Sequence, residues 1–270
     1  MLTFACGLVL AGILYTVVVY SAGLSFVWGI VFGLLGLICV NITVALILKK
    51  ITGKINNHIQ QIMLDTRHRM EVQQNQFMRR PGGNQKQMMA VFERLQNDGL
   101  RKALEACGEF DKLNKWSPLL SKQTNAMRAM FSFQLKDYAM TDKYLAKALL
   151  LDPQTISIKL VRLYKTHAPY EEMAKFYRKK CASIKGDNCV LPVALYSWIL
   201  MKLDKQDEAF KVLTEAKKKT DNEVIVKNWE LLANDKAKSF SNAGLGELWY
   251  AMGLEEMKIP KVRQQYQFRR

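Results

Sequence analysis

The chain has 270 residues, 49% of them hydrophobic, and its 40 basic against 24 acidic side chains give a net charge of +16. None of these 64 charged side chains lies before Lys49, so the first 48 residues are uncharged. Such a run has no ordinary place in a soluble domain, which argues against a soluble single-domain enzyme. The many Leu, Met, Phe, Tyr and Trp residues that follow it argue against an intrinsically disordered chain.

The uncharged segment is long enough for two membrane crossings. As one helix it would span roughly 72 Å, whereas the bilayer hydrocarbon is about 30 Å thick and needs about 20 residues. Ser21-Ala22-Gly23 is the natural break, so we expect a tight hairpin of helices at 2–20 and 24–48. A cleaved signal peptide would need a basic region that residues 1–20 lack. A single crossing, with residues 1–20 in the interface or in another protein, is less economical.

Basic residues after the second predicted helix indicate its orientation. Lys49, Lys50 and Lys54 come directly after it, and the positive-inside rule puts this end and both termini in the cytoplasm. We therefore expect a two-helix integral protein of a plasma or inner membrane. These lysines are close enough to contact anionic lipid headgroups, at about 1 kcal/mol per basic residue. An ordinary stop-transfer flank also explains them.

Small residues recur at helical spacing within both apolar helices. Gly29 and Gly33 form a GxxxG pair in the second, and Gly7 and Ala11 a similar pair in the first. Such pairs let helix backbones approach closely. We favour packing of the hairpin on itself, with homo-oligomerisation as the alternative. Asn41 lies deep enough to need a hydrogen-bond partner, which favours a packing role rather than a solute pathway.

Residues 49–80 read as a basic helical stalk. They contain no Pro, and their apolar residues recur at loosely helical spacing without a clean coiled-coil heptad. This helix can be continuous with the second membrane helix. Residues 81–84, Pro-Gly-Gly-Asn, are the clearest breaker in the chain and predict a linker to a separate domain.

The segment from residue 85 to 257 shows helical spacing with short breaks, and two parts of it correspond. Leu135 corresponds to Leu203, and four further pairs share the same offset of 68 residues, twice a period of 34. Those pairs are Ala129 with Ser197, Thr141 with Ala209, Leu145 with Leu213, and Ala148 with Ala216.

This pattern resembles the tetratricopeptide repeat family, whose units are antiparallel helix pairs with small residues at the helix crossing and a closing proline. Pro153 matches that proline, and Asp221 replaces it in the later copy. The copy between them keeps Ala174 and Cys181 at the small positions but has Arg178 where a bulky apolar residue is expected. The resemblance implies an all-α fold, with the hairpin and stalk followed by an α-solenoid that binds a peptide or helix in its groove.

No residue pattern points to catalysis, a metal or a cofactor. The histidines His58, His68 and His167 are far apart in sequence, no CxxC occurs among the five cysteines, and no nucleotide-binding or nucleophile motif is present. We therefore expect a protein that is not an enzyme and has no cofactor. Cys189 follows Gly186-Asp187-Asn188, which predicts an exposed loop cysteine, the one candidate for thiol reactivity.

A basic tail is predicted at residues 258–270. Its charged side chains are Lys258, Lys261, Arg263, Arg269 and Arg270. An acidic protein partner or an anionic membrane suits this charge. Nucleic acid is disfavoured because no nucleic-acid-binding module accompanies the tail.

Two functions fit these observations. The first is a membrane-anchored adaptor or scaffold that presents the repeat surface to a protein partner in the cytoplasm. The alternative is an accessory subunit of a membrane enzyme or secretion complex, in which the transmembrane hairpin is the docking element.

Overall fold

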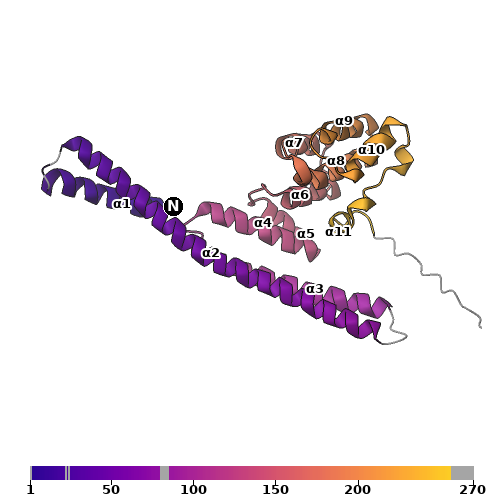
Figure 1. The fold of residues 1–270 in the computed structure, drawn as a ribbon, viewed down its shortest axis with the longest axis horizontal. Helices are drawn as coiled ribbons and strands as arrows, with labels where there is room; N and C mark the ends of the chain where they lie inside the picture. Colours follow the sequence, from indigo (N-terminus) through magenta and orange to yellow (C-terminus); the bar gives the residue numbers. More distant parts are fainter. Residues whose placement is uncertain (1, 22, 24, 80–84, 257–270) are drawn as a thin grey trace, which may run out of the picture. The chain divides into compact units, whose positions relative to one another are not determined.

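All regular secondary structure in the described part of the chain is helical (Figure 1). The computed structural model describes residues 2–21, 23, 25–79 and 85–256. The predicted all-α class is therefore confirmed. The predicted linker at 81–84 and the basic tail at 258–270 lie outside the described residues. The chain divides into two compact units, Met1–Leu150 and Leu151–Arg270, and each is described by itself.

The first unit contains five α-helices and two tighter or wider helical segments among its described residues. In chain order they are α1 (Leu2–Thr16), the π-helical η1 (Val17–Ser21), α2 (Phe26–Met78), α3 (Gln85–Ala106), the 3-10 helix η2 (Cys107–Leu113), α4 (Pro118–Gln134) and α5 (Tyr138–Leu145). The first predicted membrane helix matches α1 and η1. The second is continuous with the predicted stalk, because nothing breaks the helix between Phe26 and Met78.

Two helices of this unit are long and apolar enough to cross a membrane. They are the 20-residue segment Leu2–Ser21 and the first part of the 53-residue helix Phe26–Met78. Only 6% and 11% of their most apolar stretches is buried within the protein. A core helix of a soluble protein would be mostly covered, whereas the rest of the described chain leaves these stretches largely uncovered.

Glycines form the contact between α1 and α2. A Cβ atom on Gly33 would lie 3.2 Å from the carbonyl oxygen of Ala11, so one member of each predicted small-residue pair meets the other here, whereas Gly29 meets Tyr15 and Val19. At the other end of the contact, a Cβ atom on Gly7 would lie 3.3 Å from the Asn41 amide nitrogen. Asn41 Nδ2 donates to the Leu37 carbonyl oxygen at 2.8 Å, which satisfies the buried amide within its own helix. The hairpin thus packs on itself through these residues.

Beyond the hairpin, α2 and α3 share one hydrophobic core. Ile55 and Ile59 of α2 are buried together with Leu100, Ala103, Ala106, Cys107, Phe110 and Phe131. The two helices approach closely at Gly99, where a Cβ atom would clash with the side chain of Thr66. The predicted stalk is therefore part of the same compact unit as α3 and α4, and the unit boundary falls after Leu150 rather than at residues 81–84.

The second unit consists of short helices that fold back on one another. They are α6 (Pro153–Lys165), α7 (Tyr170–Lys180), the 3-10 helix η3 (Gly186–Cys189), α8 (Val190–Lys202), α9 (Gln206–Lys217), α10 (Glu223–Ala233), the 3-10 helices η4 (Ala237–Ser239) and η5 (Ala243–Leu245), and α11 (Glu247–Tyr250). Helix α8 is the centre of this unit, because it contacts α6, α9 and α10 and nearly all of its residues are buried.

Four helices end in the same turn. After α4, α6, α8 and α10 the second residue beyond the helix has a positive φ, at Lys136, His167, Asp204 and Asp235. In each case the next N–H donates back to a carbonyl five residues earlier, as Lys205 N does to Leu200 O at 2.9 Å. This is the Schellman arrangement, which satisfies the last carbonyls of a helix and reverses the chain. Lys136 and Asp204, and likewise His167 and Asp235, are 68 residues apart.

The close approach of α2 and α3 gives a first prediction. Gly99→Ala should lower the free energy of unfolding by about 1–3 kcal/mol, because the short Thr66 side chain cannot move away without repacking the two helices. Gly53→Ala is the matched control, since a Cβ atom there meets nothing within 4 Å and alanine favours a helix interior by about 1 kcal/mol. Thermal unfolding of the full chain in detergent measures both. A Gly99→Ala protein as stable as the parent would contradict the α2–α3 contact.

Candidate protein-binding groove

Most of the residues predicted to pack the repeat are buried. Ala129, Thr141, Leu145, Ser197, Ala209, Leu213 and Ala216 are each at most 3% exposed. The two polar members are satisfied by their own helices: Thr141 Oγ1 donates to Asp137 O at 2.7 Å, and Ser197 Oγ donates to Val193 O at 2.8 Å. Pro153 is half-buried at the first position of α6. Ala148 is half-exposed and lies after α5, which ends at Leu145.

The lysines predicted to contact lipid headgroups lie where the sequence of α2 changes from apolar to polar. Lys49, Lys50 and Lys54 are exposed on α2, directly after its apolar stretch. Lys258, Lys261, Arg263, Arg269 and Arg270 lie outside the described residues.

A groove of about 490 Å³ opens between α7, α8 and α9 in the second unit. The buried lining residues of α7 and α8 form its floor, and exposed side chains of α7 and α9 form its rim. The residues that line it are Tyr170, Ala174, Tyr177, Arg178, Ala182, Tyr196, Leu200, Glu208, Lys211, Val212, Glu215 and Lys219. It has the volume of a small-ligand pocket or of a site for a few side chains of a protein segment.

Tyrosines dominate the groove floor. The rings of Tyr177 and Tyr196 stack with centroids 4.1 Å apart and an interplanar angle of 14°. Burial raises the pKa of both phenols, and for Tyr196 a hydrogen bond with Tyr170 raises it further. The ammonium of Lys205 lies 4.2 Å from the centroid of the Tyr170 ring. With their pKa values raised, the Tyr177 and Tyr196 phenols stay neutral near pH 7, so the floor offers ring faces and hydroxyl groups rather than charge.

The rim of the groove carries an excess of accessible positive charge. Its two carboxylates already have neighbouring lysines: Glu208 pairs with Lys205 at 3.5 Å, and Glu215 pairs with Lys218 at 2.7 Å. The side chains of Arg178 and Lys211 are exposed on the opposite sides, α7 and α9. The groove therefore suits an apolar or aromatic segment that also carries acidic side chains.

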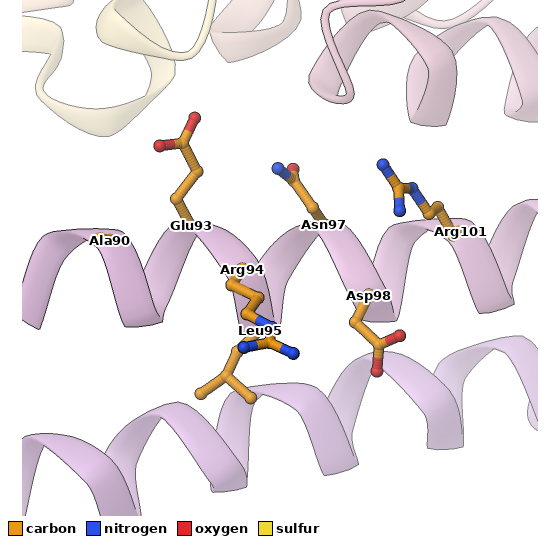
Figure 2. A pocket seen from close by; sticks show the side chains of 7 residues that line it. All are labelled: Ala90, Glu93, Arg94, Leu95, Asn97, Asp98 and Arg101. Atoms are coloured by element: carbon orange, nitrogen blue, oxygen red, sulfur yellow. The ribbon is translucent and has the colours of Figure 1, made fainter.

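A second hollow, of about 650 Å³, lies along one face of α3 and is mainly charged (Figure 2). In the view, Glu93, Asn97 and Arg101 point to the same side of the helix. Both carboxylates that line it are already paired, Glu93 with Lys136 at 3.0 Å and Asp98 with Lys102 at 3.0 Å. It offers one alanine and one leucine as apolar contacts, so the tyrosine-lined groove is the better candidate.

The histidines and cysteines do not assemble a reactive site. Among the residues described, no group of three or more His, Cys, Asp and Glu side chains has the geometry to hold a metal ion. His58 pairs with Glu109 at 3.3 Å, and His167 occupies a helix-ending turn. The expectation of an exposed Cys189 is wrong. The η3 turn places this thiol in the core, where it is 1% exposed and burial raises its pKa.

Sequence reasoning did not find the groove floor, although two signals of it are visible. Tyr170, Ala174 and Tyr177 recur on one face of a helix, with spacings of four and three residues. The Arg178 that breaks the repeat pattern is the rim residue of the groove, turned to solvent, while Ala174 and Cys181 are buried as their small-residue positions require.

No protein-family model matches this chain, and no curated protein or solved structure matches it either. The tetratricopeptide resemblance therefore depends on the residue pattern quoted above.

The buried thiols predict how stability depends on pH. Burial raises the pKa of Cys107 to about 11 and that of Cys181 to about 12, from an ordinary value of 9.0. Both thiols are protonated in both states at lower pH. Above about pH 9 only the unfolded chain releases these protons, so stability should fall by up to about 1.4 kcal/mol per pH unit for each thiol.

Alanine at both positions tests this pH dependence. The variant Cys107→Ala/Cys181→Ala should have a flatter decline in unfolding free energy between pH 9 and 11, measured by denaturant unfolding of the full chain in detergent. Ile225→Val is the control, because it trims a fully buried side chain without removing a titrating group. It should lower stability by about 0.5–1.5 kcal/mol at every pH. An unchanged slope in the double variant would show that the thiols do not titrate as described.

Proposed function

We propose that this chain is a membrane-anchored adaptor that binds a protein segment in the groove between α7, α8 and α9. The carrying observation is the combination of a stacked tyrosine floor with the exposed cations Arg178 and Lys211 on both sides. Aromatic rings and arginines are the groups that contribute most to protein interfaces. The partner segment carries apolar or aromatic side chains for the floor and acidic ones for the rim.

Paired helices with small residues at their crossings support this function. Ala209, Leu213 and Ala216 of α9 are buried, as a tetratricopeptide-like pair requires. Repeats of this kind stack into extended surfaces that bind protein partners. A groove that is lined by α7, α8 and α9 and binds a protein segment is consistent with this resemblance.

In the proposed arrangement, α1 and η1 cross the membrane in one direction and the apolar part of α2 crosses it in the other. The uncovered apolar surface of both helices supports two crossings. Lys49 and Lys50 then mark the cytoplasmic end of α2. No other described helix is long and apolar enough to cross, so the second unit is on the same side as these lysines.

Reporter fusions test the proposed topology. A reporter active only in the cytoplasm should be active when it is fused after Arg270, because the basic flank of α2 stays inside. The same reporter inserted after Gly23, at the tip of the hairpin, should be inactive, and an externally active reporter should work there. An inactive fusion at Arg270 would reverse or remove the assigned orientation.

Charge reversal at the groove rim tests the binding proposal. Arg178→Glu/Lys211→Glu should reduce recovery of the bound partner roughly tenfold, which corresponds to about 1.4 kcal/mol. The control Lys175→Glu/Lys179→Glu changes the same number of exposed charges on α7, away from the groove lining, and should leave recovery unchanged. Affinity purification of the full chain in mild detergent is the measurement. Equal loss in both variants would exclude the groove.

A truncated protein that lacks residues 2–48 distinguishes the adaptor function from the alternative function of an accessory subunit. Partners retained by this form fit an adaptor that binds through its helical units. Loss of every partner together with the hairpin would instead identify an accessory subunit that docks in the membrane.

A further inference from the structure

The start of α1 is tied by hydrogen bonds to the segment that precedes α4. The backbone N–H of Leu2 donates to the carbonyl oxygen of Lys115 at 3.2 Å. One residue further, Thr3 Oγ1 donates to the carbonyl oxygen of Trp116 at 3.2 Å. Figure 1 marks the N-terminus beside the beginning of α4, within the first unit. Residues 115 and 116 are therefore fixed at the open end of the hairpin.

The rise per residue of α1 and α2 gives the position of these two hydrogen bonds along the hairpin. Gly7 of α1 faces Asn41 of α2. From Gly7 to Leu2 the helix rises about 7.5 Å, and from Asn41 to Lys49 it rises about 12 Å in the same direction. The Lys115 carbonyl therefore lies within about one helical turn of the level of Lys49. The stretch from Phe26 to Lys49 is about 34 Å long, close to the thickness of the bilayer hydrocarbon, roughly 30 Å.

Apolar side chains are exposed at this level. Trp116 is 37% exposed and Leu119, in the first turn of α4, is 54% exposed. Ser117 caps the helix by accepting a hydrogen bond from Leu120 N at 3.4 Å, and Pro118 occupies the first helical position. The turn that holds Trp116 and Leu119 is thus locally ordered by its sequence. Tryptophan is favoured at membrane interfaces, where its ring contacts acyl chains and its N–H contacts headgroups.

Positive charge surrounds these two apolar side chains. Lys112, Lys115 and Lys122 are exposed on η2, on the connecting segment and on α4, and Lys49 and Lys50 lie at the same end of the hairpin. Two nearby carboxylates are already engaged. Asp111 accepts a hydrogen bond from Arg128 at 2.6 Å, and Glu109 lies 3.3 Å from His58. Because these carboxylates are engaged, the exposed side chains of Lys112 and Lys122, together with the two lysines of α2, favour an anionic surface.

We propose that residues 112–122 form a second membrane contact, in which Trp116 and Leu119 insert at the level of the lipid headgroups and the surrounding lysines bind anionic lipid. This inference rests on the insertion of the hairpin proposed above. The contact is continuous with the hairpin, because Leu2 and Thr3 hold the segment at its cytoplasmic end. The beginning of α4 accordingly lies on the bilayer instead of being held away from it by a stalk.

Quenching of tryptophan fluorescence by brominated lipids tests this contact. The full chain is placed in bilayers of phosphatidylserine and phosphatidylcholine, with bromine near the headgroup end of the acyl chain in one series and near the methyl end in the other. Trp116→Phe, Trp28→Phe and Trp229→Phe are compared with the parent. Trp28 reports the far end of the hairpin, and Trp229 belongs to α10 in the second unit.

The expected result is that Trp116→Phe removes emission that shallow bromines quench strongly and deep bromines quench weakly. Trp28→Phe should also remove emission that shallow bromines quench, and the emission that Trp229→Phe removes should not be quenched by either lipid series. With phosphatidylcholine alone, the share that depends on Trp116 should shrink. If Trp28 emission is quenched while Trp116 emission is not, the second contact is excluded and the anchored hairpin stands. If neither is quenched, the membrane anchor itself fails.

Discussion

The first unit depends on one uninterrupted helix, α2, whose sequence changes from apolar to polar along its length. Backbone groups inside a bilayer find no water, so a crossing segment must satisfy its hydrogen bonds internally, as a helix does. Helix α2 continues in this form from Phe26 to Met78. Its apolar part contacts α1 through glycines, and its polar part contacts α3 through Ile55, Ile59 and Thr66. A helix has a fixed rise and rotation per residue. The contact of α2 with α1 therefore also fixes how far along α2, and on which face, the residues that pack against α3 lie.

The sequence was sufficient to predict the helical class and the hairpin, but not the core shared by α2 and α3. A run of 48 uncharged residues allows few structures, whereas the apolar residues of the stalk recur only loosely and form no clean coiled-coil heptad. Only a narrow stripe of α2 is buried against α3. This stripe packs against small side chains of α3, such as Ala103, which let the two helices approach closely. Gly99 opposite Thr66 is such an approach. Recognising it requires the pairing of residues 33 positions apart across the Pro-Gly-Gly breaker, which helical periodicity does not provide.

The residues buried around the candidate groove were predictable from the sequence, but the contacts between helix pairs that form the groove were not. The 68-residue offset found side chains that are buried within helix pairs, such as Leu145 and Leu213, since burial imposes a local residue type. The stacking of Tyr177 on Tyr196 joins two different pairs, and no local pattern encodes it. Cys189 shows the opposite error, because polar neighbours suggested a loop while the η3 turn carries the thiol inward.

Helix-ending turns connect the repeat pattern to the groove. His167 after α6 and Asp204 after α8 both adopt a left-handed backbone, which costs a residue with a Cβ atom about 1–2 kcal/mol. The two hydrogen bonds of each Schellman turn offset this cost and fix the direction in which the next helix leaves. Since both turns have the same geometry, α7 and α9 return in the same way. Both helices line the groove together with α8, and its tyrosines and cations come from these three helices.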